Sequence, residues 1–227
     1  ILQMILACPE ATGTDFSGWK VLLGGSALAL GTAGQAAASG MKVFSGYGMS
    51  ETCPTLCSTY LRASELELSI EEQLPIRIKS GVPSAMVDIK IVDACGKDLP
   101  HDGESMGEVL VRAPWLTQGY LHDPEKGAEL WEGGWLHTGD IGSIDMRGDL
   151  EIKDRIKDVI KTGGEWISSL ELESLISKHP GVESVAVVGI PDLQWGERPM
   201  AMVICTPPSQ INQASLVVHL MQFVDSG

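Results

Sequence analysis

Basic residues are few in this sequence. Its 227 residues include 16 Lys and Arg against 30 Asp and Glu, which gives a formal net charge of −14 with neutral His. Proteins that bind nucleic acid without sequence preference, or that bind anionic membrane surfaces, need clustered Lys and Arg. We therefore predict no nucleic-acid partner. The apolar content of 44% is that of a folded chain rather than a disordered one.

Cysteines are also few, and they form no disulfide or metal-binding pattern. The five Cys are dispersed between Cys8 and Cys205, and only Cys53 and Cys57 lie close together. No second pair completes a zinc site, and the five His show no ligand spacing. An odd number of dispersed thiols favours free cysteines in a reducing compartment, so we expect a cytoplasmic protein.

A convincing membrane span is missing as well. Residues 21–41 are uncharged, but they contain five Gly and several polar residues. This composition favours a buried strand, a Gly-rich turn and an Ala-rich helix over a spanning helix. Residues 1–7 are apolar but lack the basic flank of a signal peptide. We therefore expect no transmembrane segment.

Two common nucleotide signatures are absent, although Gly itself is abundant. The chain has no G-x-x-x-x-G-K-[ST] phosphate loop and no G-x-G-x-x-G dinucleotide motif. It contains 26 Gly, whereas average usage would give roughly 16. Six Trp against three Phe is a second imbalance. Any nucleotide site must therefore use Gly-rich turns of another kind.

Hydrophobic periodicity divides the chain into two regions that meet near Asp154. The first region is predicted to be α/β, with a small antiparallel sheet or β-barrel subdomain over about residues 80–153, where apolar and polar residues alternate. Its expected elements are strands 19–23, 42–45, 86–93 and 108–112, helices 26–39 and 63–74, and a hairpin of 140–146 with 149–153.

The second region is predicted to be a small α+β unit. A helix over 168–178 has an apolar face, and Ser168 with Glu171 forms a capping box at its start. Its other expected elements are strands 155–161, 184–190 and 199–205 and a helix over 211–224.

Two Gly-rich stretches follow predicted strands. In the first, Gly24-Gly25-Ser26, the glycines let a flat ligand lie against the backbone, but an ordinary strand-to-helix turn has the same composition. The second, Tyr47-Gly-Met-Ser-Glu-Thr52, offers an aromatic face, two hydroxyls and a carboxylate, which suit a purine nucleotide with a Mg²⁺-bound phosphate. The alternative is a helix start with Ser50 as its cap and Glu51 in its first turn.

A third stretch places charged residues around the predicted hairpin. The Asp140 carboxylate could accept two hydrogen bonds from a ribose diol, and Arg155 could join it. The alternatives are a turn residue for Asp140 and a surface ion pair for Arg155. Lys157 and Lys161 alternate on the following predicted strand, a pattern that is usually a solvated face.

Taken in order, these stretches resemble a known family. Gly24-Gly-Ser26, Tyr47–Thr52, Gly107-Glu-Val109, Leu136–Asp140 and Asp154–Glu165 follow the motif order of the acyl-adenylate-forming (AMP-dependent synthetase/ligase) superfamily. The stretch Thr162-Gly-Gly-Glu-Trp-Ile-Ser-Ser169 is most similar to its fatty-acyl-CoA synthetase branch. The resemblance covers about residues 19–205.

The resemblance implies a nucleotide site in the first region. It assigns Gly24, Gly25 and Ser26 to the adenine and acyl pocket, and Tyr47 to stacking on adenine. It assigns Ser50 to phosphate, and it makes Glu51 a catalytic Mg²⁺ ligand. The remaining nucleotide-binding positions that it implies are Gly48, Met49, Thr52, Asp140, Ile152 and Arg155.

The resemblance implies roles for the second region too. Lys157 falls on the hinge about which the family's small domain rotates, and Lys161 matches a catalytic lysine of the thioester-forming half-reaction. Gly163, Gly164 and Glu165 match a loop that meets CoA. Trp195 stands where some relatives have a basic residue near CoA, which leaves its role open.

The implied protein is an AMP-forming acyl-CoA synthetase that uses a carboxylic acid, most simply a fatty acid, with ATP, Mg²⁺ and CoA. Two family motifs are missing, the phosphate loop before Gly24 and the lysine near the family's C-terminus. We therefore expect a fragment, inactive alone, with residues 1–154 ending the large domain and 155–227 beginning the small one. The alternatives are an adenylating enzyme that loads a carrier protein and a non-catalytic nucleotide-binding fragment. The acyl chain and a homo-oligomeric state stay open.

Overall fold

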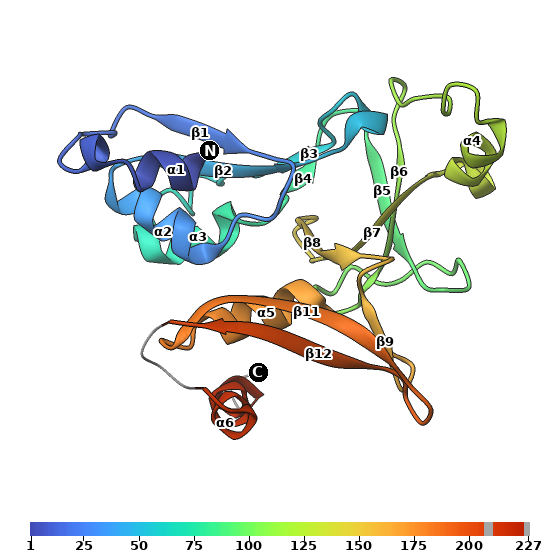
Figure 1. Cartoon of the computed structure of the whole chain (residues 1–227). Helices are drawn as coiled ribbons and strands as arrows, with labels where there is room; N and C mark the ends of the chain where they lie inside the picture. The colour runs from blue at the N-terminus through green and yellow to red at the C-terminus, as the bar shows by residue number, and fades with distance from the viewer. Residues whose placement is uncertain (207–210, 225–227) are drawn as a thin grey trace. The chain divides into compact units, whose positions relative to one another are not determined.

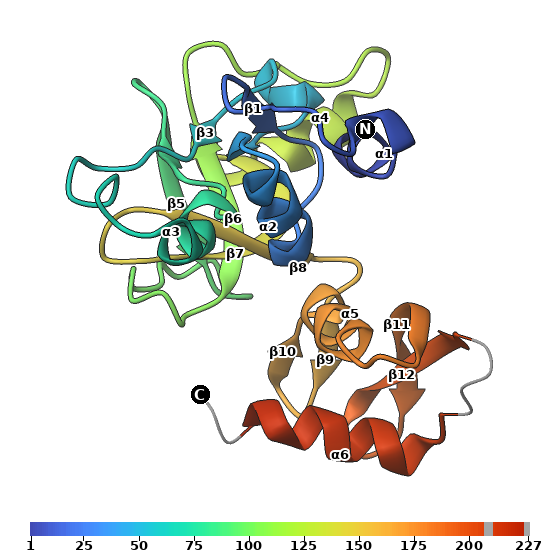
Figure 2. The same cartoon turned by 90° about the vertical axis from the view of Figure 1, so that its left-hand side faces the viewer.

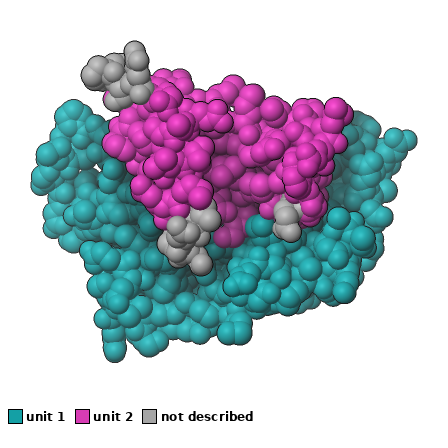
Figure 3. Space-filling view, turned by 90° about the horizontal axis from the view of Figure 1, so that it is seen from below, with its two compact units in different colours: residues 1–138, 142–152 teal, residues 139–141, 153–227 magenta. Residues whose placement is uncertain are grey.

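The chain forms two compact units. The computed structural model describes residues 1–206 and 211–224, and the side chains of these residues except Glu165 and Val224. Unit 1 consists of residues 1–138 and 142–152, and unit 2 of residues 139–141 and 153–227 (Figure 3). The chain is a mixed α/β structure with three four-stranded sheets in the described residues, in agreement with the predicted fold class.

The first half of unit 1 is a sheet with the strand order β1-β2-β3-β4, accompanied by three helices (Figure 1). The strands are β1 (Lys20–Leu23), β2 (Lys42–Tyr47), β3 (Cys57–Ser58) and β4 (Val82–Pro83), and the helices are α1 (Leu2–Leu6), α2 (Leu30–Ala38) and α3 (Ile70–Arg77). Strands β1 and β2 are parallel, with Leu23 opposite Ser45. Apolar side chains of α1, α2 and β2 form the core of this half, among them Leu2, Ala33 and Val43.

Both helices predicted in this half begin later than the sequence indicated. Helix α2 begins at Leu30 instead of residue 26. The helix predicted over 63–74 is α3, which begins at Ile70 and continues through Pro75 to Arg77. Its start is set by Ser69, which accepts a hydrogen bond from the Glu72 N–H while the Glu72 carboxylate accepts one from the Ser69 N–H. This capping box satisfies two backbone donors, and a prediction from apolar spacing alone missed it.

The second half of unit 1 is built on the sheet β5-β6-β7-β8, except that residues 139–141 of β7 and 153–155 of β8 belong to unit 2. Its strands are β5 (Asp88–Val92), β6 (Gly107–Arg112), β7 (Leu136–Ile144) and β8 (Leu150–Arg155). Strands β5 and β6 are antiparallel, with Ile91 opposite Val109, and both side chains are fully buried. Helix α4 (Pro124–Leu130), which the sequence did not predict, lies between β6 and β7 and is capped by the Asp123 side chain.

Unit 2 is an antiparallel sheet with two helices beside it (Figure 2). The strands, in the order β10-β9-β12-β11, are β9 (Ile160–Thr162), β10 (Glu165–Ile167), β11 (Val182–Asp192) and β12 (Gly196–Cys205); the helices are α5 (Ser169–Ser177) and α6 (Gln213–Val224). Ile160, Ile176 and Val187 form the buried core. Ser168 caps α5 by accepting a hydrogen bond from the Glu171 N–H, which is one of the two hydrogen bonds of the predicted capping box.

The strand predicted over 155–161 is wrong. Strand β8 ends at Arg155, and β9 begins only at Ile160. Between them the N–H groups of Asp158 and Val159 both donate to the Arg155 carbonyl, which makes a turn. The alternating lysines therefore do not share one strand, because Lys157 lies in this turn and Lys161 in β9.

Among the described residues, no helix has the length and apolar character needed to cross a membrane. All five Cys are free, as expected. The part of the chain that the structure describes also contains no group of three or more His, Cys, Asp or Glu side chains that could hold a metal ion by themselves.

Candidate nucleotide and CoA sites

The two Gly-rich loops of unit 1 follow adjacent parallel strands. Gly24, Gly25 and Ser26 come directly after β1 and are exposed, whereas Tyr47 is the last residue of β2. Because the carboxyl ends of parallel strands meet at one edge of a sheet, the two loops share that edge, where ligands of α/β sheets commonly bind. Gly25 has a φ of +87°, which favours glycine, and a Cβ at Gly24 would lie 3.4 Å from the Gly46 carbonyl oxygen.

The loop after β2 is folded tightly onto itself. A Cβ at Gly48 would coincide with the carbonyl oxygen of Pro54, so only glycine lets the chain double back here. The Thr52 hydroxyl accepts a hydrogen bond from the Met49 N–H at 2.9 Å and lies 2.8 Å from the Pro54 carbonyl oxygen. Thr52 is fully buried, so its hydroxyl is used inside the loop.

Ser50 and Glu51 follow Met49 in this loop, and Glu51 is half-buried. Ser50 is exposed and is the first residue of a short 3-10 turn, Ser50–Thr52, that follows Met49. The alternative in which Ser50 caps a helix is therefore wrong, because no α-helix begins here and Ser50 lies inside the turn. A hydroxyl and a carboxylate offer oxygen atoms of the kind that Mg²⁺ prefers, and the roles of Ser50 and Glu51 toward phosphate and Mg²⁺ stay predictions.

A segment that the sequence did not single out holds the Glu51 turn in place. The Tyr120 O–H donates to Glu51 Oε1 at 2.7 Å, and the Thr117 N–H donates to the Glu51 carbonyl oxygen at 2.9 Å. The Trp115 indole N–H donates to the Thr52 carbonyl oxygen at 3.1 Å. The hydrogen bond to Glu51, followed by burial, raises the pKa of the Tyr120 phenol. The only sequence feature that could have pointed to this segment was the unexplained excess of Trp.

Asp140 and Arg155 meet in unit 2. Asp140 lies in the middle of β7 with a side chain only 10% exposed, and Arg155 ends β8. The Arg155 Nε lies 2.7 Å from Asp140 Oδ1. The two side chains are therefore paired, as the ion-pair alternative for Arg155 has it, and their joint binding of a ribose diol stays a prediction. The alternative of Asp140 as a turn residue is wrong because it belongs to a strand. Ile152, also in β8, is half-buried against the core of unit 1.

The residues matched to the CoA loop lie around the turn between β9 and β10. Gly163 and Gly164 form this turn with φ values of +59° and +91°, which glycine adopts readily. The Gly163 N–H donates to the Trp195 carbonyl oxygen at 2.8 Å, and a Cβ at Gly163 would lie 3.0 Å from the Trp195 ring. Trp195 therefore packs on this turn. The side chain of Glu165 lies outside the described part of the structure.

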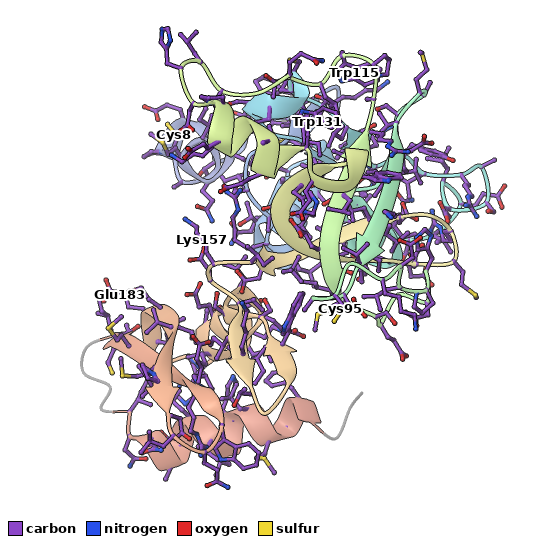
Figure 4. The ribbon with its side chains drawn as sticks, turned by 90° about the vertical axis from the view of Figure 1, so that its right-hand side faces the viewer. Cys8, Cys95, Trp115, Trp131, Lys157 and Glu183 are labelled. Carbon is purple, nitrogen blue, oxygen red and sulfur yellow. The ribbon has the colours of Figure 1, made fainter. Side chains whose placement is uncertain are left out.

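The two lysines near this loop are both exposed. Lys157 lies in the turn between β8 and β9 (Figure 4), and Lys161 lies in β9. The Lys161 N–H donates to Glu197 Oε2 of β12 at 2.8 Å, which ties the strand that carries Lys161 to its neighbour. The structure thus brings Lys161, Gly163 and Trp195 together within unit 2, while the Tyr47–Thr52 loop belongs to unit 1.

Comparison with known families gives two matches along this chain. Residues 1–121 match the family described as AMP-binding enzyme, and residues 171–226 match the AMP-binding enzyme C-terminal domain. The chain is 40% identical over 186 residues to a long-chain-fatty-acid–CoA ligase of Thermus thermophilus, and 40% identical over 178 residues to a 3-methylmercaptopropionyl-CoA ligase of Ruegeria lacuscaerulensis. These alignments cover 82% and 78% of this chain, but only 34% and 33% of the relatives.

A solved structure supports the same comparison at the level of the fold and the sequence. The amide bond synthetase McbA from Marinactinospora thermotolerans superimposes with a TM-score of 0.80 at 28% identity, over 97% of this chain and 43% of that protein. The chain spans about a third of the length of the curated relatives it matches.

Proposed function

Because the chain belongs to the AMP-binding enzyme family, we propose that it is a segment of an AMP-forming acid–CoA ligase. The observation that carries the proposal is the shared edge of β1 and β2, where Gly24-Gly25-Ser26 and the Glu51 loop follow adjacent parallel strands. Further support comes from two relatives that are CoA ligases. Both are 40% identical to this chain, but their names give different acids as substrates. For this reason the proposal names a carboxylic acid, with a fatty acid as the first candidate.

The reaction has two steps. A carboxylate is a poor acyl donor, so it first attacks the α-phosphorus of ATP, which forms an acyl adenylate and releases pyrophosphate. The thiol of CoA then attacks the acyl carbon and AMP leaves. The two steps need different arrangements of the reacting groups. A chain built from two units can supply both, because one unit can move between the steps.

In unit 1 we assign nucleotide binding to the edge of β1 and β2. Gly24, Gly25 and Ser26 would border the base and the acyl group, and Tyr47 would stack on adenine. Gly48 and Met49 shape the loop, and Thr52 holds it closed through its hydroxyl. Ser50 is exposed and would contact phosphate.

Glu51 is the proposed ligand of Mg²⁺. Mg²⁺ is commonly held by one or two carboxylates together with substrate phosphates and water, so the single half-buried carboxylate of Glu51 fits it. When bound, Mg²⁺ neutralises phosphate charge that builds up during the attack.

In unit 2 we assign ribose binding to Asp140, with Arg155 as its partner. Ile152, which belongs to unit 1, would lie beside the nucleotide. Lys157 is the proposed hinge, since it lies in the turn that connects β8 with β9. Lys161, Gly163, Gly164 and Glu165 are assigned to the thioester-forming step with CoA. The proposed domains are residues 1–154 and 155–227, as parts of a large and a small domain.

Carboxylate-dependent exchange between ATP and labelled pyrophosphate tests the proposal in the whole ligase. Exchange with at least one member of a panel of fatty and short-chain acids is expected, and no exchange with any of them would contradict the adenylation step. The 227 residues alone are expected to form no acyl-CoA, because they hold neither the family's phosphate loop nor its C-terminal lysine. Formation of acyl-CoA by the 227 residues alone would contradict the expectation that they are inactive.

Two alternatives concern the group that receives the acyl chain, and a third is a nucleotide-binding module without catalysis. The likeness to an amide bond synthetase favours a comparison of acceptors, because adenylate-forming enzymes differ in the group that receives the acyl chain. CoA, a phosphopantetheinyl carrier protein and an amine are therefore offered in parallel to the whole ligase with the same acid. If product forms with the carrier protein or the amine but not with CoA, the proposed acid–CoA ligase function is wrong, and the acceptor that gave product takes the place of CoA. Binding of AMP without turnover of any acceptor would instead favour a non-catalytic module.

A further inference from the structure

The segment of residues 115–131 is bound to the Glu51 turn by hydrogen bonds from three positions. The donors are the Trp115 indole, the Thr117 N–H and the Tyr120 phenol. Two of these hydrogen bonds end on backbone carbonyls, so they fix the course of the turn. Only the third ends on the Glu51 side chain, at Oε1.

This segment is itself anchored in unit 1. The Trp131 indole N–H donates to the Thr117 carbonyl oxygen at 2.9 Å, which closes the segment on itself. Leu116 and Leu130 are buried in the apolar core of the β5–β8 half, and Trp131 packs against that core. Figure 4 labels Trp115 and Trp131, whose indoles hold the two ends of the segment. The position of the Tyr120 hydroxyl is therefore determined by tertiary packing and not by a free loop.

We propose that Tyr120 is a positioning residue that orients the Glu51 carboxylate for its divalent cation. The inference rests on the proposed function, in which Glu51 is the Mg²⁺ ligand. Within the described part of the chain, Tyr120 is the one side chain that hydrogen-bonds the Glu51 carboxylate, and it does so at Oε1. The other oxygen, Oε2, would then be available to the cation.

The physical reason is the conformational freedom of Glu. A Glu side chain loses substantial rotamer entropy when it is fixed, and a hydrogen bond made before the cation arrives removes part of that freedom in advance. Hydrogen-bonding partners of metal ligands act in this way in many sites, and their loss commonly weakens metal affinity about 10- to 100-fold. Tyr120 is 42% exposed, so water competes for this hydrogen bond. A smaller effect, about three- to tenfold, is therefore expected.

The test uses the whole ligase and measures nucleotide binding, without turnover. The dissociation constant of a non-hydrolysable ATP analogue is determined by calorimetry with and without Mg²⁺ for the unmodified protein, Tyr120→Phe and Glu51→Gln. The ratio of the two constants reports the coupling between cation and nucleotide. Tyr120→Phe keeps the ring and removes only the hydroxyl. Leu121→Ala is the matched control, because Leu121 is the neighbouring residue and its side chain is exposed.

The Mg²⁺-dependent gain is the factor by which Mg²⁺ tightens binding of the ATP analogue. Tyr120→Phe is expected to reduce this gain about three- to tenfold and to raise the Mg²⁺ concentration for half-saturation by the same factor. Binding without Mg²⁺ and the Leu121→Ala protein should match the unmodified ligase. If Glu51→Gln loses the gain while Tyr120→Phe keeps it, the positioning role is wrong and the proposed function survives. If neither variant changes the gain, Glu51 is not the cation ligand, and both proposals for this residue fail.

Discussion

Arg155 and Asp140 form an ion pair in which Arg155 Nε lies 2.7 Å from Asp140 Oδ1. The Asp140 side chain is 10% exposed and that of Arg155 is 49% exposed. Because water screens the guanidinium, the pair itself stabilises the fold by at most about 1 kcal/mol. The pair joins the middle of β7 to the end of β8, next to the Ile156 N–H that donates to the Gly139 carbonyl oxygen at 2.8 Å. Arg155 thus orients a largely buried carboxylate at the start of unit 2.

Asp140→Asn is expected to weaken AMP binding by the whole ligase about 10- to 100-fold, because an amide replaces a charged acceptor of two ribose hydroxyls. Calorimetry with AMP and with 2′-deoxy-AMP checks the reason, since the variant should lose less affinity for the nucleotide that already lacks one hydroxyl. Asp98→Asn is the matched control, because Asp98 pairs with Lys90 at 2.7 Å and lies outside the proposed site. Equal losses for both nucleotides would count against ribose recognition by Asp140.

Gly48→Ala is expected to destabilise unit 1 by about 2 kcal/mol or more, because its Cβ would coincide with the Pro54 carbonyl oxygen and the loop would have to open. Gly18→Ala is the control, since a Cβ there has nothing within 4 Å. Urea denaturation of the 227-residue chain measures both free energies of unfolding. Equal stabilities of the two variants would show that the loop tolerates a side chain at Gly48.

Asp154→Ala is expected to destabilise unit 2 by about 2–4 kcal/mol, because it leaves buried donors without an acceptor. Asp154 is 2% exposed and accepts hydrogen bonds from the Ser169 N–H at 2.6 Å, the Ser169 hydroxyl at 2.8 Å and the Arg155 N–H at 2.8 Å. Asp158→Ala should have little effect, because Asp158 is exposed in the next turn. Hydrogen exchange of the α5 amides reports the loss locally. Unchanged protection of α5 in the Asp154 variant would contradict this role.

Cys57 is expected to be inert in the folded protein. Burial raises the pKa of its thiol to about 12, from an ordinary value of 9.0, so almost no thiolate forms at neutral pH. Alkylation at pH 8 followed by mass spectrometry should label the exposed Cys8, Cys53 and Cys95 quickly, and Cys57 only after denaturation. Rapid labelling of Cys57 without unfolding would contradict its burial.

The same thiol predicts a direction of stability with pH. The folded state favours the protonated form, so the contribution of Cys57 is complete below about pH 9 and is lost as the pH rises from 9 towards 12. Cys57→Ala removes a buried group and lowers stability overall, but its free energy of unfolding should fall less steeply over that pH range. Parallel slopes for both proteins would rule out this source of pH dependence.

Much of the local structure was predictable from the sequence. The start of α5 at Ser168 and the strands β1, β2 and β6 follow from capping residues and alternation, which depend on neighbours within a few positions. The start of α3 was missed because the Ser69–Glu72 capping box was overlooked, not because it was hidden. The turn after Arg155 was missed for a different reason, since an alternating pattern continued through a backbone reversal.

The sequence by itself determined the order of the Gly-rich loops, the identity of their chemical groups and the family that they resemble, because these depend only on which residues follow one another. Only the tertiary structure decided what faces those groups. Tyr120 lies 69 positions from Glu51 in the sequence and Trp115 lies 63 positions from Thr52, yet both side chains reach the same turn. Such pairs form because the β5–β8 core anchors one segment against another, and no local pattern records that anchoring.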